Sequence, residues 1–86
     1  MELKDTVEMM LSDDYRERFK AEYYQTKIRY EKLKKFGNEI EAAQLMAGEE
    51  SKFNCRLMLI RDQQRHMGQY LHILEIRAEI EHIDVE

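Results

Sequence analysis

The sequence predicts an all-α protein in which a short N-terminal helix precedes a long antiparallel helical hairpin, and it predicts that this hairpin forms oligomers. The 86 residues contain no proline and only three glycines, whereas strands usually need turn residues between them. Apolar side chains recur in steps of three and four over two long stretches, as in amphipathic helices. Each helix of a hairpin covers only one side of its neighbour, so part of each wide apolar face needs another partner.

A short first helix is predicted over about residues 2–11, because apolar side chains recur there at helical spacing. These side chains are Leu3, Val7, Met10 and Leu11. We expect this helix to be a flap on the hairpin or an arm exchanged between subunits. The acids Asp13 and Asp14 follow, and they suit both the N-cap and the positive end of the next helix dipole.

The second helix is predicted over about residues 13–46. Gly37 leaves two interpretations open: it ends this helix and Asn38 caps a new one, or the helix continues through it at a cost of about 1 kcal/mol. The apolar seam continues in register beyond Gly37, which favours one helix to about Met46, with a bend at Gly37 as a variant. Gly48 then ends the helix.

The third helix is predicted over about residues 55–82, with Asn54 as its N-cap and a short turn over residues 49–53 before it. Such a short turn makes the two long helices antiparallel neighbours. The acidic tail after His82 is expected to fray. We assign the oligomer interface to the wide apolar face of this helix. Its members are Leu57, Ile60, Gln64, Met67, Tyr70, Leu71, Leu74 and Ala78.

The composition excludes several classes of protein. The formal net charge is −4, although residues 13–36 carry an excess of bases. This overall balance is not typical of a nucleic-acid-binding protein, so direct nucleic-acid binding is not expected. No apolar stretch approaches the roughly 18 residues of a membrane span, and no signal peptide is visible. The single cysteine, Cys55, allows no intrachain disulfide and fits a reducing compartment. We therefore expect a cytoplasmic protein.

The sequence contains no recognisable catalytic or metal-binding pattern. Among His66, His72 and His82 the closest pair is six residues apart, which does not place two imidazoles on one helix face. A nucleophile, a general base and an oxyanion donor cannot be assembled from the chain. We expect neither an enzyme nor a bound metal or cofactor.

A line of alternating basic and aromatic residues runs along the second helix in steps of three and four. Such a line can stack a nucleobase and neutralise its phosphates. Alternatively, the tyrosines line the hairpin seam and the lysines extend around it to solvent. Together with Arg77 of the third helix, these residues are the candidate ligand-binding or partner-binding set. The line consists of Arg16, Lys20, Tyr23, Lys27, Tyr30 and Lys34.

These features resemble a family of small helical-hairpin accessory proteins of phages and prophages, related to a protein of a crAss-like phage and common in Firmicutes. The resemblance covers residues 15–82 except the turn region, residues 42–52, which is longer here. It implies phage or prophage origin and an accessory, non-structural role. The matching residues are Glu22, Tyr23, Arg29, Leu33, Gln63, Met67, Tyr70, Leu74, Glu75 and Arg77.

Three functions follow as hypotheses. The first is a phage protein that counters bacterial defence by binding and blocking a host immune effector, as an anti-CRISPR inhibitor does. The alternative is an oligomeric sponge that sequesters a cyclic nucleotide or a cyclic ADP-ribose immune signal. A further alternative is a structural coiled-coil partner. The expected partners are therefore a second copy of the chain and either a host defence protein or a nucleotide, in the cytoplasm of an infected or lysogenic bacterium.

Overall fold

The computed structural model describes residues 1–48 and 55–85, and most of these residues are helical, with no strand among them. A 3₁₀ turn, η1 (Leu3–Thr6), leads into the short helix α1 (Val7–Met10), and the long helices α2 (Tyr15–Met46) and α3 (Cys55–Glu81) follow. The predicted all-α class is confirmed. The radius of gyration is 16.3 Å, against about 12 Å for a compact domain of this length. The molecule is therefore a rod, with extents of 51 × 26 × 18 Å.

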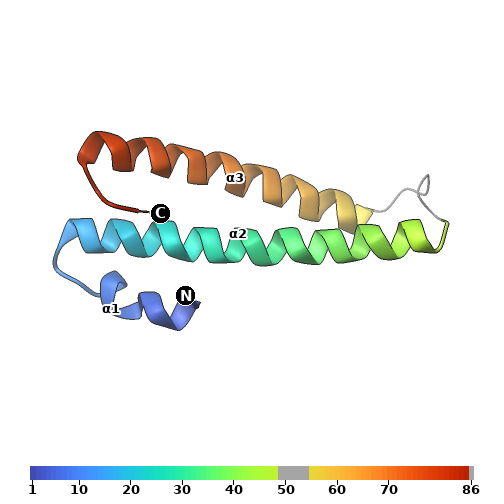
Figure 1. Ribbon diagram of the computed structural model, residues 1–86, viewed down its shortest axis with the longest axis horizontal. Helices are drawn as coiled ribbons and strands as arrows, with labels where there is room; N and C mark the ends of the chain where they lie inside the picture. The colour runs from blue at the N-terminus through green and yellow to red at the C-terminus, as the bar shows by residue number, and fades with distance from the viewer. Residues whose placement is uncertain (49–54, 86) are drawn as a thin grey trace.

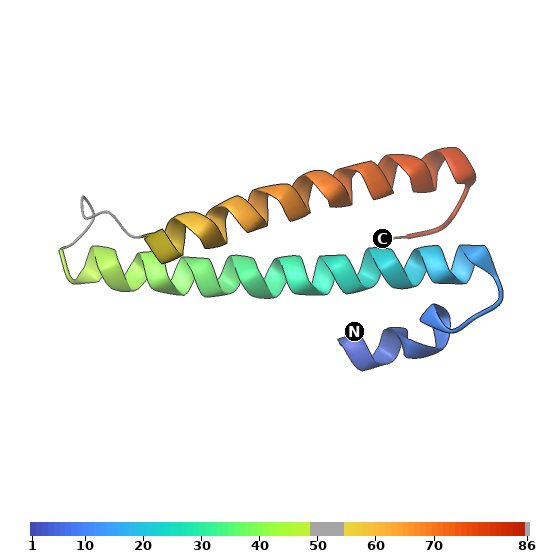
Figure 2. The same cartoon turned by 180° about the vertical axis from the view of Figure 1, so that it is seen from behind.

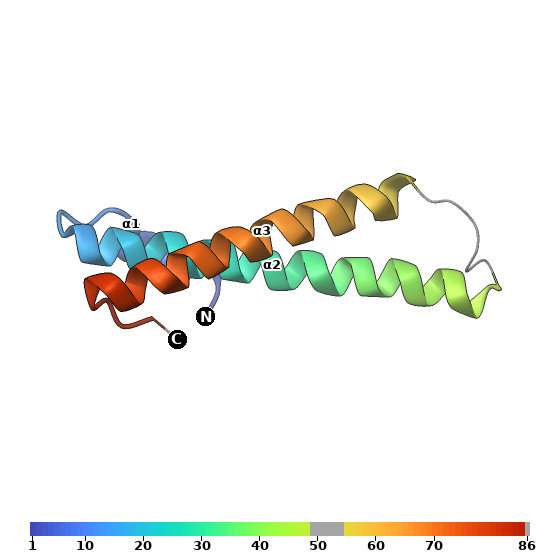
Figure 3. The same ribbon diagram turned by 90° about the horizontal axis from the view of Figure 1, so that it is seen from above.

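The two long helices run antiparallel, and the N-terminal segment lies on the other side of α2 (Figures 1 and 2). From above, α3 crosses α2 obliquely (Figure 3). The N-terminal segment is held through Thr6, which is fully buried. Its hydroxyl oxygen accepts a hydrogen bond of 2.8 Å from Gln25 Nε2 of α2. Within this chain the first segment is thus a flap on α2.

Helix α2 begins and ends at residues suited to those positions. The carboxylate of Asp14 accepts a hydrogen bond of 2.9 Å from the backbone N–H of Arg16, which satisfies one of the free donors of the first turn. Gly48, with φ of 74°, follows the last turn in the left-handed conformation that glycine adopts without strain. Between these ends α2 is continuous through Gly37.

Gly37 is buried against the side chains of Ile60 and Arg61 of α3. A Cβ atom at this position would lie 2.9 Å from Arg61 Nη1 and 3.2 Å from Ile60 Cγ2 of α3. The absence of a side chain therefore leaves room for the Ile60 and Arg61 side chains, which offsets the low helix propensity of glycine.

The hydrophobic core lies in the half of the hairpin that contains the chain ends. Ile83 belongs to this core and Val85 packs against it, so the expectation that the tail frays is wrong for the described residues 83–85. His82 has φ of 55° and turns the chain back, and Ile83 is only 5% exposed. Residues 83–85 run back along the hairpin toward α2 (Figure 1). The buried core residues are Phe19, Tyr23, Leu71, Leu74, Ala78 and Ile83.

The predicted turn over residues 49–53 and the predicted N-cap Asn54 lie outside the described residues.

Candidate functional site

A groove with a volume of about 1030 Å³ lies between α2 and α3. Helix α2 contributes Tyr30 and Asn38 to its walls, and α3 contributes the other lining residues. None of the lining side chains is acidic, whereas two arginines and one histidine are present, so the groove is suited to an anion. The α3 lining consists of Arg61, Gln64, Arg65, Gly68, Gln69, His72 and Ile73.

The polar side of the groove follows from a simple helical spacing on α3. Arg61, Arg65, Gly68 and His72 are separated by four, three and four residues, and such residues share one helix face. Gly68 carries no side chain, and a Cβ atom there would lie 3.3 Å from Cε1 of Tyr30. The tyrosine ring therefore packs close to the α3 backbone and reaches the groove between the basic side chains.

The two arginines of the groove are held differently. Arg61 donates hydrogen bonds to Gln64 at 2.7 Å, to Asn38 at 2.9 Å and to Glu41 at 3.2 Å, and so bridges α3 to α2. Arg65 forms an ion pair of 2.9 Å with Asp62, and both side chains are at least half exposed. Exposed ion pairs contribute less than about 1 kcal/mol, so Arg65 can exchange this carboxylate for another anion at small cost.

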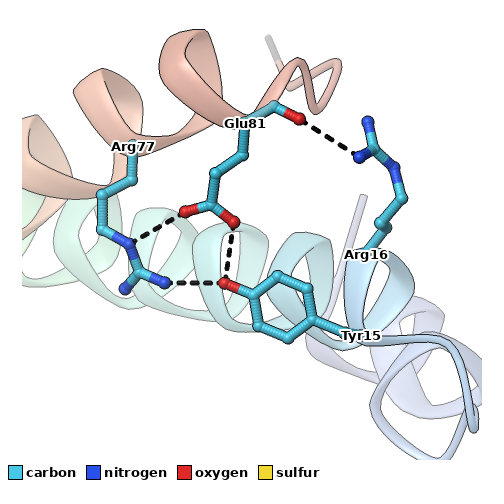
Figure 4. Close-up of polar contacts among 4 residues, drawn as sticks. All are labelled: Tyr15, Arg16, Arg77 and Glu81. Atoms are coloured by element: carbon cyan, nitrogen blue, oxygen red, sulfur yellow. Dashed lines mark hydrogen bonds and ion pairs between the residues drawn. The ribbon is translucent and has the colours of Figure 1, made fainter.

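Two members of the predicted basic and aromatic set connect the helix ends instead (Figure 4). Arg16 donates to the backbone carbonyl oxygens of Glu81, at 3.1 Å, and of His82. Arg77 donates to Glu81 Oε2 at 3.3 Å and to the Tyr15 hydroxyl oxygen at 2.7 Å. The Tyr15 hydroxyl in turn donates to Glu81 Oε1 at 2.9 Å.

This network also favours the charged form of Arg77. The Coulomb interaction with Tyr15 is the main cause that raises the pKa of the Arg77 guanidinium, and Glu81 raises it further. The network therefore stabilises the positive charge of the guanidinium. In this structure it joins α3 to the start of α2, where its guanidinium carbon also lies 5.1 Å from the centre of the Phe19 ring.

The other members of the line lie in several environments. Tyr23 is fully buried, and its hydroxyl donates to Glu75 at 3.0 Å. The Lys27 ammonium lies 5.7 Å from the centre of the Tyr23 ring, Lys20 pairs with Glu17 at 3.9 Å, and Lys34 is exposed. Only Tyr30 of the predicted set lines the large groove. Lys27 and Tyr30 together line a smaller pocket of about 220 Å³.

The residues assigned to the oligomer interface lie mostly between α2 and α3 of the same chain. Ile60, Leu71, Leu74 and Ala78 are buried, and Leu57, Gln64 and Met67 are half-buried, whereas Tyr70 is exposed. A second copy could contact the buried residues only if the hairpin opened. The interface itself stays a prediction.

The basic face of α3 is not among the sites predicted from the sequence. The feature of the sequence that could have indicated this site is the spacing of Arg61, Arg65 and His72 around Gly68. That spacing becomes meaningful only once the face of α3 that borders α2 is known.

Within residues 1–48 and 55–85, no group of three or more His, Cys, Asp or Glu side chains could hold a metal ion. Over the same residues, no helix combines the length and the apolar character needed to cross a membrane.

Comparison with known proteins gave one match. The model of a family described as Sequestin matches residues 13–80, which include most of both long helices. No curated protein and no solved structure matches the chain.

Proposed function

The chain belongs to the Sequestin family, and we propose that it acts without catalysis, by holding a nucleotide immune signal in the groove between α2 and α3. The family description suggests that its members sequester a partner or a ligand. The phage or prophage origin implied by the sequence resemblance is part of this proposal. A phage protein that removes a signalling nucleotide from solution would silence the defence that depends on the signal.

The lining of the groove is the observation that supports this proposal. Arg61 and Arg65 offer planar guanidinium groups one helical turn apart, which suit phosphate oxygens better than ammonium groups do. The ring of Tyr30 offers an aromatic surface on which a base can stack. The side-chain amides of Asn38 and Gln69 each provide donors and an acceptor for the edge of a base. The groove therefore offers a partner for each part of a nucleotide: the phosphate, the face of the base and its polar edge.

The size of the groove agrees with a ligand of this class. Small-molecule sites commonly measure about 300–1,000 Å³, and the groove, at about 1030 Å³, is at the upper end of this range. A mononucleotide would leave part of it empty. A larger nucleotide with two phosphates would contact both Arg61 and Arg65, so we expect cyclic dinucleotides and cyclic ADP-ribose isomers to bind more tightly than cyclic mononucleotides.

A thermal-shift panel of these nucleotides, followed by calorimetric titration, tests the proposal. A ligand at about 100 times its dissociation constant stabilises the folded state by about 2.7 kcal/mol. Arg65→Gln should weaken binding by at least about tenfold, which corresponds to about 1.4 kcal/mol. Arg29→Gln is the matched control, because Arg29 is an exposed arginine of α2 that does not line the groove. A flat panel, or equal loss of binding in both variants, would contradict the proposal.

A second candidate is the binding and blocking of a host immune effector. Large apolar side chains exposed on α3, among them Ile73, Ile76 and Ile80, favour it, because such side chains support contacts between proteins. An effector nuclease assayed with excess protein separates the two functions. Loss of nuclease activity with no nucleotide present would favour blocking, whereas full activity would leave sequestration.

A further inference from the structure

A second pocket, which we call the flap pocket, lies between the N-terminal segment and α2 and has a volume of about 390 Å³. It shares no lining residue with the large groove. We propose that the flap pocket binds a nucleoside monophosphate, with its phosphate on Lys27 and Lys32 and its base against Tyr24. This site does not depend on what the large groove binds. The flap pocket is lined by Met1, Tyr24, Lys27, Ile28, Glu31 and Lys32.

Hydrogen bonds hold the N-terminal segment beside this part of α2. The backbone N–H of Glu2 donates to Asp5 Oδ2 at 2.7 Å, and the fully buried Thr6 accepts a hydrogen bond of 2.8 Å from Gln25 Nε2 of α2. Met1, next to this turn, lines the pocket opposite α2. A preformed site loses little conformational entropy when its ligand binds. Because the Sequestin match begins at residue 13, this side of the pocket lies outside the matched residues.

The apolar lining of the flap pocket offers a surface for a base. The Tyr24 ring meets the ring of the fully buried Tyr23 edge to face, with 5.4 Å between their centres, so the core fixes its position. Ile28 follows one helical turn later, and both Tyr24 and Ile28 are half-buried. An aromatic side chain can stack any base, and the polarisable thioether of Met1 makes favourable contacts with aromatic rings. One base therefore has apolar contacts from both α2 and the N-terminal segment.

Lys27 and Lys32 provide the charge for a terminal phosphate. Among residues 1–48 and 55–85, neither ammonium group forms an ion pair. A phosphate monoester carries a charge of about −2 at about pH 8, which two lysines neutralise, whereas each phosphate of a cyclic nucleotide is a diester with a single negative charge. The flap pocket therefore suits a linear monophosphate, and its volume, near the lower end of the range of about 300–1,000 Å³ for small-molecule sites, suits one base and one phosphate.

Glu31 is the acidic residue of the pocket, and we assign it to the edge of the base. In the part of the chain that the structure describes, its carboxylate has no ion-pair partner. A carboxylate accepts hydrogen bonds and donates none. Guanine presents two neighbouring N–H donors, at N1 and at the 2-amino group, whereas adenine presents an amino group beside an acceptor nitrogen. GMP should therefore bind more tightly than AMP.

Calorimetric titration of the whole chain with GMP at about pH 8 tests the site. One GMP should bind per chain, and inorganic phosphate and guanosine should each bind at least about tenfold more weakly, because each lacks one half of the contacts. Lys32→Gln should weaken GMP binding by at least about fivefold, because a charged contact to the phosphate is lost. Lys35→Gln is the matched control: Lys35 is exposed on α2, does not line the pocket, and its loss changes the net charge equally.

Three results would overturn the proposal. They are no binding of GMP at about 1 mM, equal weakening in the two lysine variants, and weakening in Arg65→Gln, which would place GMP in the large groove. The binding of cyclic dinucleotides should be unchanged in Lys32→Gln. A chain that binds these dinucleotides but not GMP would thus refute the flap pocket alone and leave the proposed function standing.

The assignment of Glu31 has its own test. Glu31→Gln replaces the carboxylate by an amide, which offers both a donor and an acceptor to the edge of a base. The ratio of the GMP affinity to the AMP affinity should fall by at least about threefold in this variant. An unchanged ratio would refute the contact between Glu31 and the base. Since Glu31 is exposed, the substitution should leave the helical circular dichroism unchanged.

Discussion

Leu74→Ala should reveal how much of the stability of this protein depends on the contact between α2 and α3. Leu74 is 0% exposed and belongs to the core cluster with Phe19 and Tyr23 of α2. The substitution removes three carbon atoms, which at about 0.8 kcal/mol per buried methylene gives about 2.4 kcal/mol. The remaining cavity adds to this loss, and buried Leu-to-Ala changes cost about 2.7–5 kcal/mol. We expect about 3 kcal/mol, because a two-helix layer can relax around a cavity more than a thick core can.

This loss is large compared with the total. Domains of this length have free energies of unfolding of about 4–13 kcal/mol, and a loss of 3 kcal/mol should lower Tm by roughly 10–25 °C. Urea denaturation at one fixed protein concentration measures the change. Leu45→Ala is the control, because Leu45 is an exposed leucine of α2 and its loss should cost less than about 0.5 kcal/mol. A loss below about 1 kcal/mol in Leu74→Ala, or one no larger than in the control, would refute the assignment of the core to this contact.

Three further substitutions have defined outcomes. Asp14→Ala should lower the free energy of unfolding by about 1 kcal/mol in urea denaturation, because it removes the N-cap of α2; no loss would show that another group caps the helix. Gly37→Ala should lower the free energy of unfolding by about 1 kcal/mol although alanine has the better helix propensity, because the alanine Cβ would lie 3.2 Å from Cγ2 of the buried Ile60. A gain in Tm would mean that α3 can move away from Gly37. Arg77→Met should reduce Tm by the same amount at about pH 6 and about pH 9. Tyr15 is the main cause of the raised pKa of Arg77. The stability that Arg77 contributes is therefore fully present at any pH below the unfolded-state pKa, and it is lost only as pH rises through the still higher folded-state pKa. A loss of Tm that differs between the two pH values would argue against this network.

The sequence predicted the helical class and the start of α2 well, because these features depend on local interactions. Asp14 caps α2 through a bond to the N–H two residues later, and Gly48 ends the helix through its own backbone preference. The continuity of α2 through Gly37 stayed open, because helix propensity alone disfavours glycine. The close approach of Ile60 and Arg61 from α3 explains why glycine is present there.

The candidate site was predicted less well, for a related reason. A helical line of bases and tyrosines does not show which side chains the neighbouring helix covers. Tyr23 became part of the core and Arg77 part of the network at the helix ends, whereas Tyr30 reached the groove through the space left by Gly68. The tail after His82 was also misjudged, because burial of Ile83 requires the gap between two helices that are distant in sequence.

The sequence by itself determined that this protein is made of helices and approximately where the long ones lie, because helix periodicity, caps and glycine stops act within a few residues. Only the tertiary structure decided which side of α3 meets α2. Apolar side chains occupy two sides of this helix, and the period of 3.6 residues does not show which of the two sides is buried. The contact between the two helices buries Leu71 and Leu74 of α3 against Phe19 and Tyr23 of α2. That choice leaves Ile73, Ile76 and Ile80 on the outside, where they are available to another molecule.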